Sequence, residues 1–129
     1  MQMKAIRYIV SLFLLLAAMA CSHVDEITPR SYVGLLFGDT KPLRDEIAQA
    51  LSSGKAVSSA GTLTLKPRGD GLMVASIDLG WVTAGGAIVV HNKKYGVVII
   101  QEPKVSQNGV TWSCVVYPAE AKPNACGVQ

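Results

Sequence analysis

Hydrophobic residues fall into three successive patterns along the chain: one unbroken block, then one helical stripe, then a series of short extended runs. The block spans residues 8–20 and contains no charged residue. The stripe is formed by Leu43, Ile47, Ala50 and Leu51, which are spaced i, i+4, i+7 and i+8. This spacing places the four apolar side chains on one side of a helix, and it predicts a helix of about three turns over residues 42–53.

Both ends of the predicted helix carry boundary signals. Asp39 or Thr40 can cap its N-terminus, and Gly54 lies just past its C-terminus. Polar residues fill the rest of the helix surface, and they are Arg44, Asp45, Glu46 and Gln49. Because a helix this short is held mainly by packing, we expect it to lie on a sheet.

The chain from residue 58 onward has the pattern of β-strands separated by turns. Extended runs are predicted at residues 62–65, 73–82, 87–91, 95–101 and 110–117. Residues 68–71 indicate a turn, and residues 102–108 indicate a longer link. The continuous apolar run at residues 97–100 favours a central strand, or one covered on both faces. The predicted fold class is therefore α+β, with one short helix packed on a four-stranded antiparallel β-meander.

Residues 22–41 show no sustained period, and Pro29, Gly34 and Gly38 interrupt them. We interpret this stretch as a tether that becomes ordered toward residues 32–37. The apolar residues there are expected to dock on the domain. Left uncovered, they would instead form an exposed patch that marks a partner site.

The N-terminal block resembles a secretory signal. Lys4 and Arg7 provide a positive start, the apolar core follows, and small residues end the segment. A bilayer-spanning helix needs about 20 apolar residues, so a cleaved signal is favoured over a permanent anchor helix. The predicted organisation is a signal peptide at 1–20, a tether at 21–41 and a globular domain at 42–129.

Two kinds of processing fit the end of this signal. Residues 18–20 fit an ordinary signal-peptidase site, whereas the same residues with Cys21 resemble a bacterial lipoprotein box. Lipidation is favoured because Cys114 and Cys126 can pair, which leaves Cys21 as an unpaired thiol in an oxidising compartment. In a lipoprotein, Ser22 after the cysteine implies sorting to the outer membrane, with the lipid holding the protein to the membrane.

The charge of the chain changes once the signal is set aside. The whole chain has 129 residues and a net charge of +3, which supports one small domain. Without Lys4 and Arg7, ten basic and nine acidic residues remain, and the net charge is +1. The composition therefore gives no support for nucleic acid as a partner.

Residues able to perform catalysis are few. His23 and His91 have no Cys, His or carboxylate at metal-ligand spacing, so neither a metal site nor a cofactor is indicated. Asp70 and Asp78 are interpreted as single surface acids rather than an acid/base pair. Arg68-Gly69-Asp70 is interpreted as a polar turn rather than an integrin-binding loop. The sequence thus argues against an enzyme.

The two tryptophans are predicted to be structural. Trp81 and Trp112 lie in predicted strands, where each would bury a large apolar face in the core. The alternative, a carbohydrate-binding platform, would require both rings to be exposed and coplanar.

The C-terminal region is predicted to be closed by a disulfide. Cys114 lies on the last predicted strand and Cys126 lies three residues before the C-terminus. The intervening segment contains Pro118 and Pro123 and has no helical period. A Cys114–Cys126 bridge would hold this tail against the sheet.

The order of several short motifs resembles the globular head of type IV pilins. These motifs are Gly85-Gly86-Ala-Ile-Val-Val, then Asn108-Gly109-Val-Thr-Trp112-Ser-Cys114, then Pro123-Asn-Ala-Cys126. The resemblance covers residues 42–127 and implies a helix on an antiparallel sheet with a disulfide-bounded loop. It also implies that the sheet edge and this loop are the contact surfaces for a protein partner. The residues assigned to that role are Tyr117, Glu120, Lys122 and Asn124.

The chain departs from pilins at its N-terminus. The Phe-rich helix with a Glu, which packs in the core of a pilus, has no counterpart after Cys21. The first functional hypothesis is therefore a lipid-tethered, pilin-like binding protein, acting as a type IV pilus accessory or as a pilin mimic. Two alternatives stay open: an immunity or inhibitor lipoprotein against an exported toxin or hydrolase, and a minor pilin with a mis-assigned start.

Substitution of Cys21 tests the anchor. We expect cells expressing the chain to incorporate radioactive fatty acid into it, and Cys21→Ser to abolish the label because no other cysteine follows the signal directly. Immunoprecipitation and autoradiography measure the label. An unlabelled wild-type chain would contradict lipidation and leave the ordinary signal-peptidase site.

Overall fold

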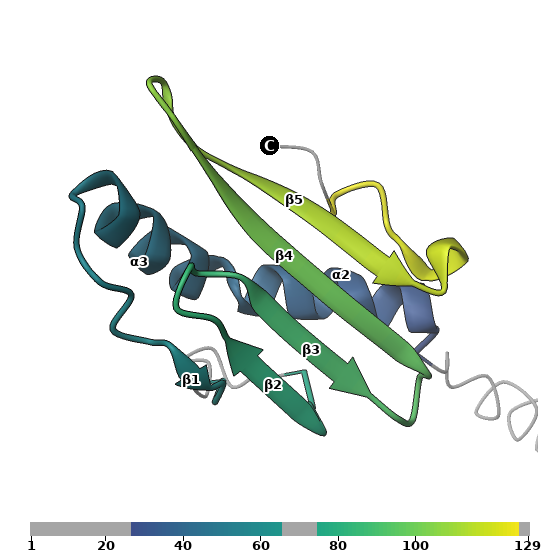
Figure 1. Ribbon diagram of the computed structural model, residues 1–129. Coiled ribbons are helices and arrows are strands. Elements are labelled where there is room, and N and C mark those ends of the chain that lie inside the picture. Colours follow the sequence, from purple (N-terminus) through teal and green to yellow (C-terminus); the bar gives the residue numbers. More distant parts are fainter. Residues whose placement is uncertain (1–26, 66–74, 127–129) are drawn as a thin grey trace, which may run out of the picture.

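The computed structural model describes residues 27–65 and 75–126. In the described part, two helices, α2 (Pro29–Asp39) and α3 (Lys41–Ser52), lie in line on one face of a sheet. The sheet has five strands: β1 (Gly61–Thr62), β2 (Leu79–Val82), β3 (Ile88–Asn92), β4 (Val97–Ser106) and β5 (Gly109–Tyr117). A 3-10 turn, η1 (Ala119–Ala121), follows the last strand. Figure 1 looks onto the sheet with the helices behind it.

The sheet is a simple antiparallel meander, with spatial order β1-β2-β3-β4-β5. The α+β class and the meander are confirmed, but the predicted number of four strands is wrong, because the sheet has five. β4 lies between β3 and β5, so its apolar run belongs to an interior strand next to the edge strand β5, whereas the middle strand of the five is β3. The prediction of a link at residues 102–108 is wrong, because β4 continues to Ser106 and pairs with β5 as far as Ser106 and Gly109.

The predicted tether is in fact the largest correction to the sequence analysis. Residues 29–39 form α2, whose side chains Tyr32, Val33 and Leu36 are buried in the core. Docking of this segment is thus confirmed, but as a helix. The start of α2 follows ordinary helix chemistry, because Pro29 is in the first turn and the Thr28 Oγ1 accepts a hydrogen bond from the Ser31 N–H at 3.1 Å. In the sequence, Pro29 is interpreted as an interruption, whereas in the structure it is in the first turn of a helix.

The two helices are separated only at Thr40. The Thr40 N–H donates to the Leu36 carbonyl and the Arg44 N–H donates to the Thr40 carbonyl, each at 2.9 Å, so helical hydrogen bonding runs through the junction. Pro42 has no N–H to donate to the carbonyl of Gly38, which explains the interruption at this point. The predicted helix at 42–53 is confirmed within one residue at each end, as α3. Thr40 occupies its N-cap position, without a side-chain cap hydrogen bond.

The core lies between the helices and the covered face of the sheet. Its sheet side is formed by alternate residues of β2 to β5, so each strand contributes one apolar row. Leu36 and Ile47 of the helices are fully buried against these rows. Trp112 lies in this core with 8% of its surface exposed, which confirms its predicted role.

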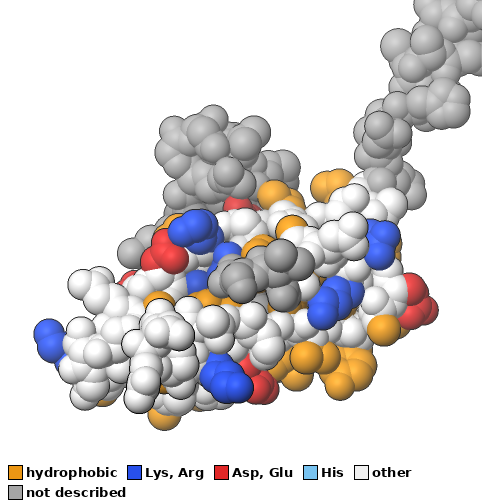
Figure 2. All heavy atoms as spheres, turned by 90° about the horizontal axis from the view of Figure 1, so that it is seen from above, with side chains coloured by type: hydrophobic (Ala, Val, Ile, Leu, Met, Phe, Trp, Pro, Cys, Tyr) orange, Lys and Arg blue, Asp and Glu red, His pale blue; other side chains and the backbone are white. Residues whose placement is uncertain are grey.

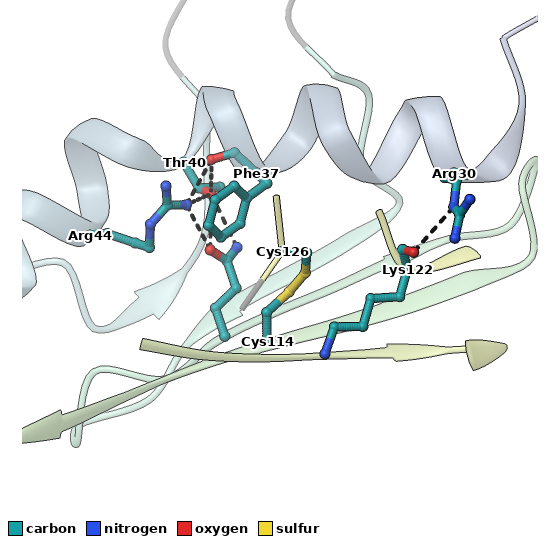
Figure 3. The surroundings of a disulfide bond; sticks show 8 residues. Arg30, Phe37, Thr40, Arg44, Cys114, Lys122 and Cys126 are labelled. Carbon is teal, nitrogen blue, oxygen red and sulfur yellow. Dashed lines mark hydrogen bonds between the residues drawn. A yellow bond between two sulfur atoms is a disulfide. The ribbon is translucent and has the colours of Figure 1, made fainter. Parts of the chain in front are cut away.

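A polar cluster is buried inside this otherwise apolar interface (Figure 3). The Arg44 Nη1 donates to the Gln101 Oε1 and to the Phe37 carbonyl, both at 2.7 Å, and to the Thr40 Oγ1 at 2.8 Å. The Gln101 Nε2 donates to the Thr40 Oγ1 at 3.1 Å. Arg44 is only 3% exposed, although the sequence analysis placed it on the polar surface of the helix. Burial lowers the pKa of Arg44, and the nearby Asp45 carboxylate partly opposes that shift.

Arg44 also covers the ring of Phe37, with its guanidinium carbon 3.8 Å from the ring centroid. A cation over an aromatic face is attracted by the ring quadrupole, and this attraction is stronger when water is excluded. The cluster therefore connects the end of α2, the junction at Thr40 and the middle of β4 through one side chain.

Removal of Arg44 alone is expected to be costly. Arg44→Met should lower the free energy of unfolding by about 3 kcal/mol, because the Gln101 Oε1 and the Phe37 carbonyl are then left with the single proton of the Thr40 hydroxyl between them. The double variant Arg44→Met/Gln101→Leu should recover part of that loss, because both polar partners are then replaced by apolar groups. Urea unfolding of the three proteins measures the difference.

The matched control for this prediction is Lys55→Met, which removes an exposed cation just after α3. It should change the free energy of unfolding by less than about 0.5 kcal/mol. Equal losses in Arg44→Met and Lys55→Met would contradict the role assigned to the buried cluster.

Candidate partner-binding surface

The sheet face opposite the helices, which we call the outer face, is unusually apolar. Alternation along the strands determines which residues point outward, since inner and outer positions differ by one residue. The outward apolar residues in the body of the sheet define what we call the outer patch. They are Leu79, Trp81, Val89, Val98, Ile100, Val115 and Tyr117. Figure 2 shows hydrophobic side chains protruding at the lower margin, which is the side that faces the viewer in Figure 1.

The pairing register brings these residues into two rows across the sheet. One row runs from Trp81 through Val89 and Ile100 to Val115. The second runs from Leu79 through His91 and Val98 to Tyr117. Neighbours in such a row are about 5 Å apart, so each row forms a continuous ridge.

Several members of the outer patch are strongly exposed. Leu79 is 61% exposed, Trp81 49%, Val115 42% and Tyr117 60%. The prediction that Trp81 is a core residue is therefore wrong. The reason is the register of β2: Gly80 and Val82 occupy the inner positions, so Leu79 and Trp81 must point outward.

Gly80 occupies an inner position of β2 where there is no space for a larger side chain. A Cβ at this position would lie 2.8 Å from Ile77 Cδ1 and 2.9 Å from Leu63 Cβ. The inner space at this point is already filled by those two side chains, so only a glycine can face inward. A sequence signal existed, because a Gly next to Trp in a strand suggests a close approach of another segment.

A second candidate surface is the segment that follows β5. Residues 118–126 form a tail that we call the clipped tail, and the Cys114–Cys126 disulfide joins its end to β5. The predicted disulfide is thus confirmed. Ala121 and Cys126 are buried at 4% and 2% exposure, which anchors the tail inward at two points.

Backbone hydrogen bonds between residues three apart in the sequence stabilise the turns of the clipped tail. The Ala121 N–H donates to the Pro118 carbonyl and the Cys126 N–H donates to the Pro123 carbonyl, both at 3.1 Å. The Arg30 Nε of α2 donates to the Lys122 carbonyl at 3.2 Å, which ties the tail to the helices (Figure 3). The tail is consequently ordered despite having little regular structure.

The structure separates the four predicted partner-binding residues into two groups. Glu120, Lys122 and Asn124 are exposed on the clipped tail, whereas Tyr117 belongs to the outer patch. The three tail residues present one negative, one positive and one amide side chain. Such a polar set suits recognition by hydrogen bonds and charge rather than by apolar packing.

The remaining candidate residues give no catalytic constellation in the described part of the chain. Cys21, His23 and the Arg68-Gly69-Asp70 turn lie outside the described residues. His91 is partly exposed on the outer face between Leu79 and Val98. The Asp78 carboxylate accepts a hydrogen bond from the Lys93 N–H, so it supports the turn between β3 and β4.

A cavity of about 700 Å³ lies between the start of α3 and residues 58–65. Two carboxylates border it, and both make hydrogen bonds. The Asp39 Oδ2 accepts from the Ala75 N–H at 2.8 Å, and the Glu46 Oε1 accepts from the Ser58 Oγ at 3.2 Å. Both carboxylates therefore stabilise the backbone and side chains around the cavity through hydrogen bonds.

Two further findings concern the described residues alone. No group of three or more His, Cys, Asp or Glu side chains among them could hold a metal ion. No described helix is both long enough and apolar enough to cross a membrane.

Tyr32 is a buried tyrosine of the core. Burial raises the pKa of its hydroxyl group, and its ring stacks on the ring of Tyr95 with centroids 4.7 Å apart.

Comparison of the chain with known protein families, with curated proteins and with solved structures finds no match.

The disulfide should contribute measurably to stability. Replacing both cysteines (Cys114→Ser/Cys126→Ser) should lower the free energy of unfolding by about 3 kcal/mol, because the unfolded chain is then no longer cross-linked. Urea unfolding under oxidising conditions measures the loss. The matched control is wild-type protein in reductant, which should approach the stability of the double variant; a reduced wild type as stable as the oxidised one would contradict this role.

Proposed function

We propose that this protein is a non-catalytic envelope lipoprotein whose pilin-like head binds a protein partner, as an accessory of a type IV pilus system or as a pilin mimic. The observation that carries the proposal is the order of its parts. A helix packed on an antiparallel meander is followed by a tail that a disulfide closes onto the last strand. The same order is implied by the resemblance to pilin heads, and it supports that resemblance.

The arrangement of cysteines supports a lipid anchor. Cys114 and Cys126 are bonded to each other, so Cys21 is the one cysteine of the sequence left for attachment to lipid. The described domain begins a few residues after this position, at Ile27. A head attached in this way would stand close to the membrane surface, and it would lack the N-terminal helix with which pilins polymerise.

The clipped tail is the proposed contact surface for the partner. It is held in one conformation by the disulfide, by two buried side chains and by Arg30, so little conformational entropy is lost on binding. Glu120, Lys122 and Asn124 are exposed on it and can form directed polar contacts. A rigid scaffold that presents exposed polar residues on a loop is typical of recognition sites.

A charge exchange on the tail tests this function. Glu120→Lys/Lys122→Glu keeps the net charge but reverses both charges, and we expect it to reduce partner capture at least 10-fold. The matched control is Lys41→Asp/Asp45→Lys, which reverses an exposed ion pair on α3 and should leave capture unchanged. Capture is measured in cells that have type IV pili, by photo-crosslinking from a benzoylphenylalanine residue at Asn124 in the full chain and mass spectrometry of the product.

The identity of the captured protein decides between the functions. A pilus component supports the proposal. An exported toxin or hydrolase would contradict it and would support the immunity or inhibitor alternative. Absence of any cross-linked product from Asn124 would contradict the assignment of the tail as a contact surface.

A further inference from the structure

The proposed function places its contact on the clipped tail, and of the four predicted partner-binding residues only Tyr117 lies in the outer patch, so that function leaves most of the patch unexplained. Four large apolar side chains on it are 42–61% exposed, and they lie in two adjacent rows rather than singly, one row wholly apolar and the other containing His91. Scattered apolar residues on a surface need no explanation, whereas contiguous patches mark interaction sites. The exposed side chains of the outer patch form such a contiguous patch, and they are Leu79, Trp81, Val115 and Tyr117.

The adjacent part of the same sheet shows that outward apolar residues are not a general property of these strands. Beyond Gln101, β4 and β5 pair only with each other and form a two-stranded arm. The outward positions of this arm are all polar or charged: Glu102, Lys104, Thr111 and Ser113. The change from apolar to polar therefore coincides with the boundary of the sheet body, as expected for an interface core with a polar rim.

The shape of the patch favours another sheet as its partner. A twisted sheet packs well on a sheet of the same twist, with the two stacked about 10 Å apart and the strands crossing at about 30°. A second copy of this chain supplies a sheet of identical twist with the same two rows of mainly apolar side chains. The resulting contact would be isologous, with each patch covering its counterpart.

Charge and area are also compatible with a second copy. Glu102 and Lys104 are the charged residues on the outer positions of the paired strands, and their charges cancel, so two outer faces do not repel each other. The patch covers four strands, about 19 Å, and about 17 Å along β4; with the polar outer face of the two-stranded arm as its rim, the surface measures about 500 Å² in projection. The accessible surface of protruding side chains exceeds this projection, and it approaches the roughly 800 Å² per partner that a stable interface buries.

We propose that two copies of this protein associate through their outer patches, forming a symmetric dimer in which the two sheets pack face to face between outer layers of helices. The clipped tail remains a separate surface, because Glu120, Lys122 and Asn124 lie outside the patch. Dimerisation therefore stands independently of the proposed function, and each can fail without the other.

A photo-crosslinking experiment on the full chain tests the dimer. Benzoylphenylalanine replaces Trp81 in the patch, or Gln49 on the exposed side of α3 as a positional control. Two differently tagged copies are co-expressed and irradiated. We expect position 81 to give a product of twice the chain mass that carries both tags, and position 49 to give at least 10-fold less.

A matched pair of valine substitutions tests the surface itself. Val115→Lys places a charge inside the patch, whereas Val105→Lys places the same charge on an exposed valine near the tip of the arm. Without benzoylphenylalanine, Val115→Lys should reduce co-purification of the two tagged copies at least 10-fold, and Val105→Lys should leave it within about twofold. Formation of the Cys114–Cys126 disulfide in both variants, measured by thiol labelling, shows that each is folded.

Three outcomes would overturn the proposal. The first is the absence of a doubly tagged product from position 81. The second is a product in which position 81 is joined to a different protein, which would assign the patch to another partner. The third is equal co-purification of folded Val115→Lys and Val105→Lys.

Discussion

The guanidinium group of Arg44 is the point through which the two layers of this protein are connected. It is almost fully buried, and a single nitrogen donates to the last turn of α2, to Thr40 and to Gln101 of β4. A buried cation is tolerated only where its donors are satisfied, so the arrangement allows little freedom in the placement of the helices. The helix pair is thereby positioned over β4, on the face of the sheet to which Gln101 belongs.

Because the helices cover one face of the sheet, the opposite face is exposed. With the helices on one side, the alternation of β2 to β5 directs one set of side chains into the core and the other set outward. The close approach of Leu63 and Ile77 reserves the inward position of β2 for Gly80, and Trp81 is consequently outside. A large aromatic residue in an exposed position is thus a result of sheet register combined with local packing.

The two candidate surfaces differ in construction and in the chemistry they suit. The clipped tail is polar, is anchored by a disulfide and by a hydrogen bond from Arg30, and presents its side chains individually. The outer patch is apolar, and regular strand pairing holds its side chains in rows. Directed polar recognition suits the first surface, whereas packing against a surface of matching shape suits the second. A domain with both surfaces could bind a partner and a second copy at the same time.

Local patterns in the sequence were sufficient for α3, for the meander and for the Cys114–Cys126 bridge, because spacing, turn residues and cysteine count act over short distances. They also contained the start of α2 at Thr28 and Pro29, but Gly34 and Gly38 obscured it. Only the tertiary structure could reveal the burial of Arg44, since its partner Gln101 is 57 residues away in the chain. The same holds for the outer patch: alternation groups residues on one side of a strand, but which side the helices cover is decided by contacts between distant segments.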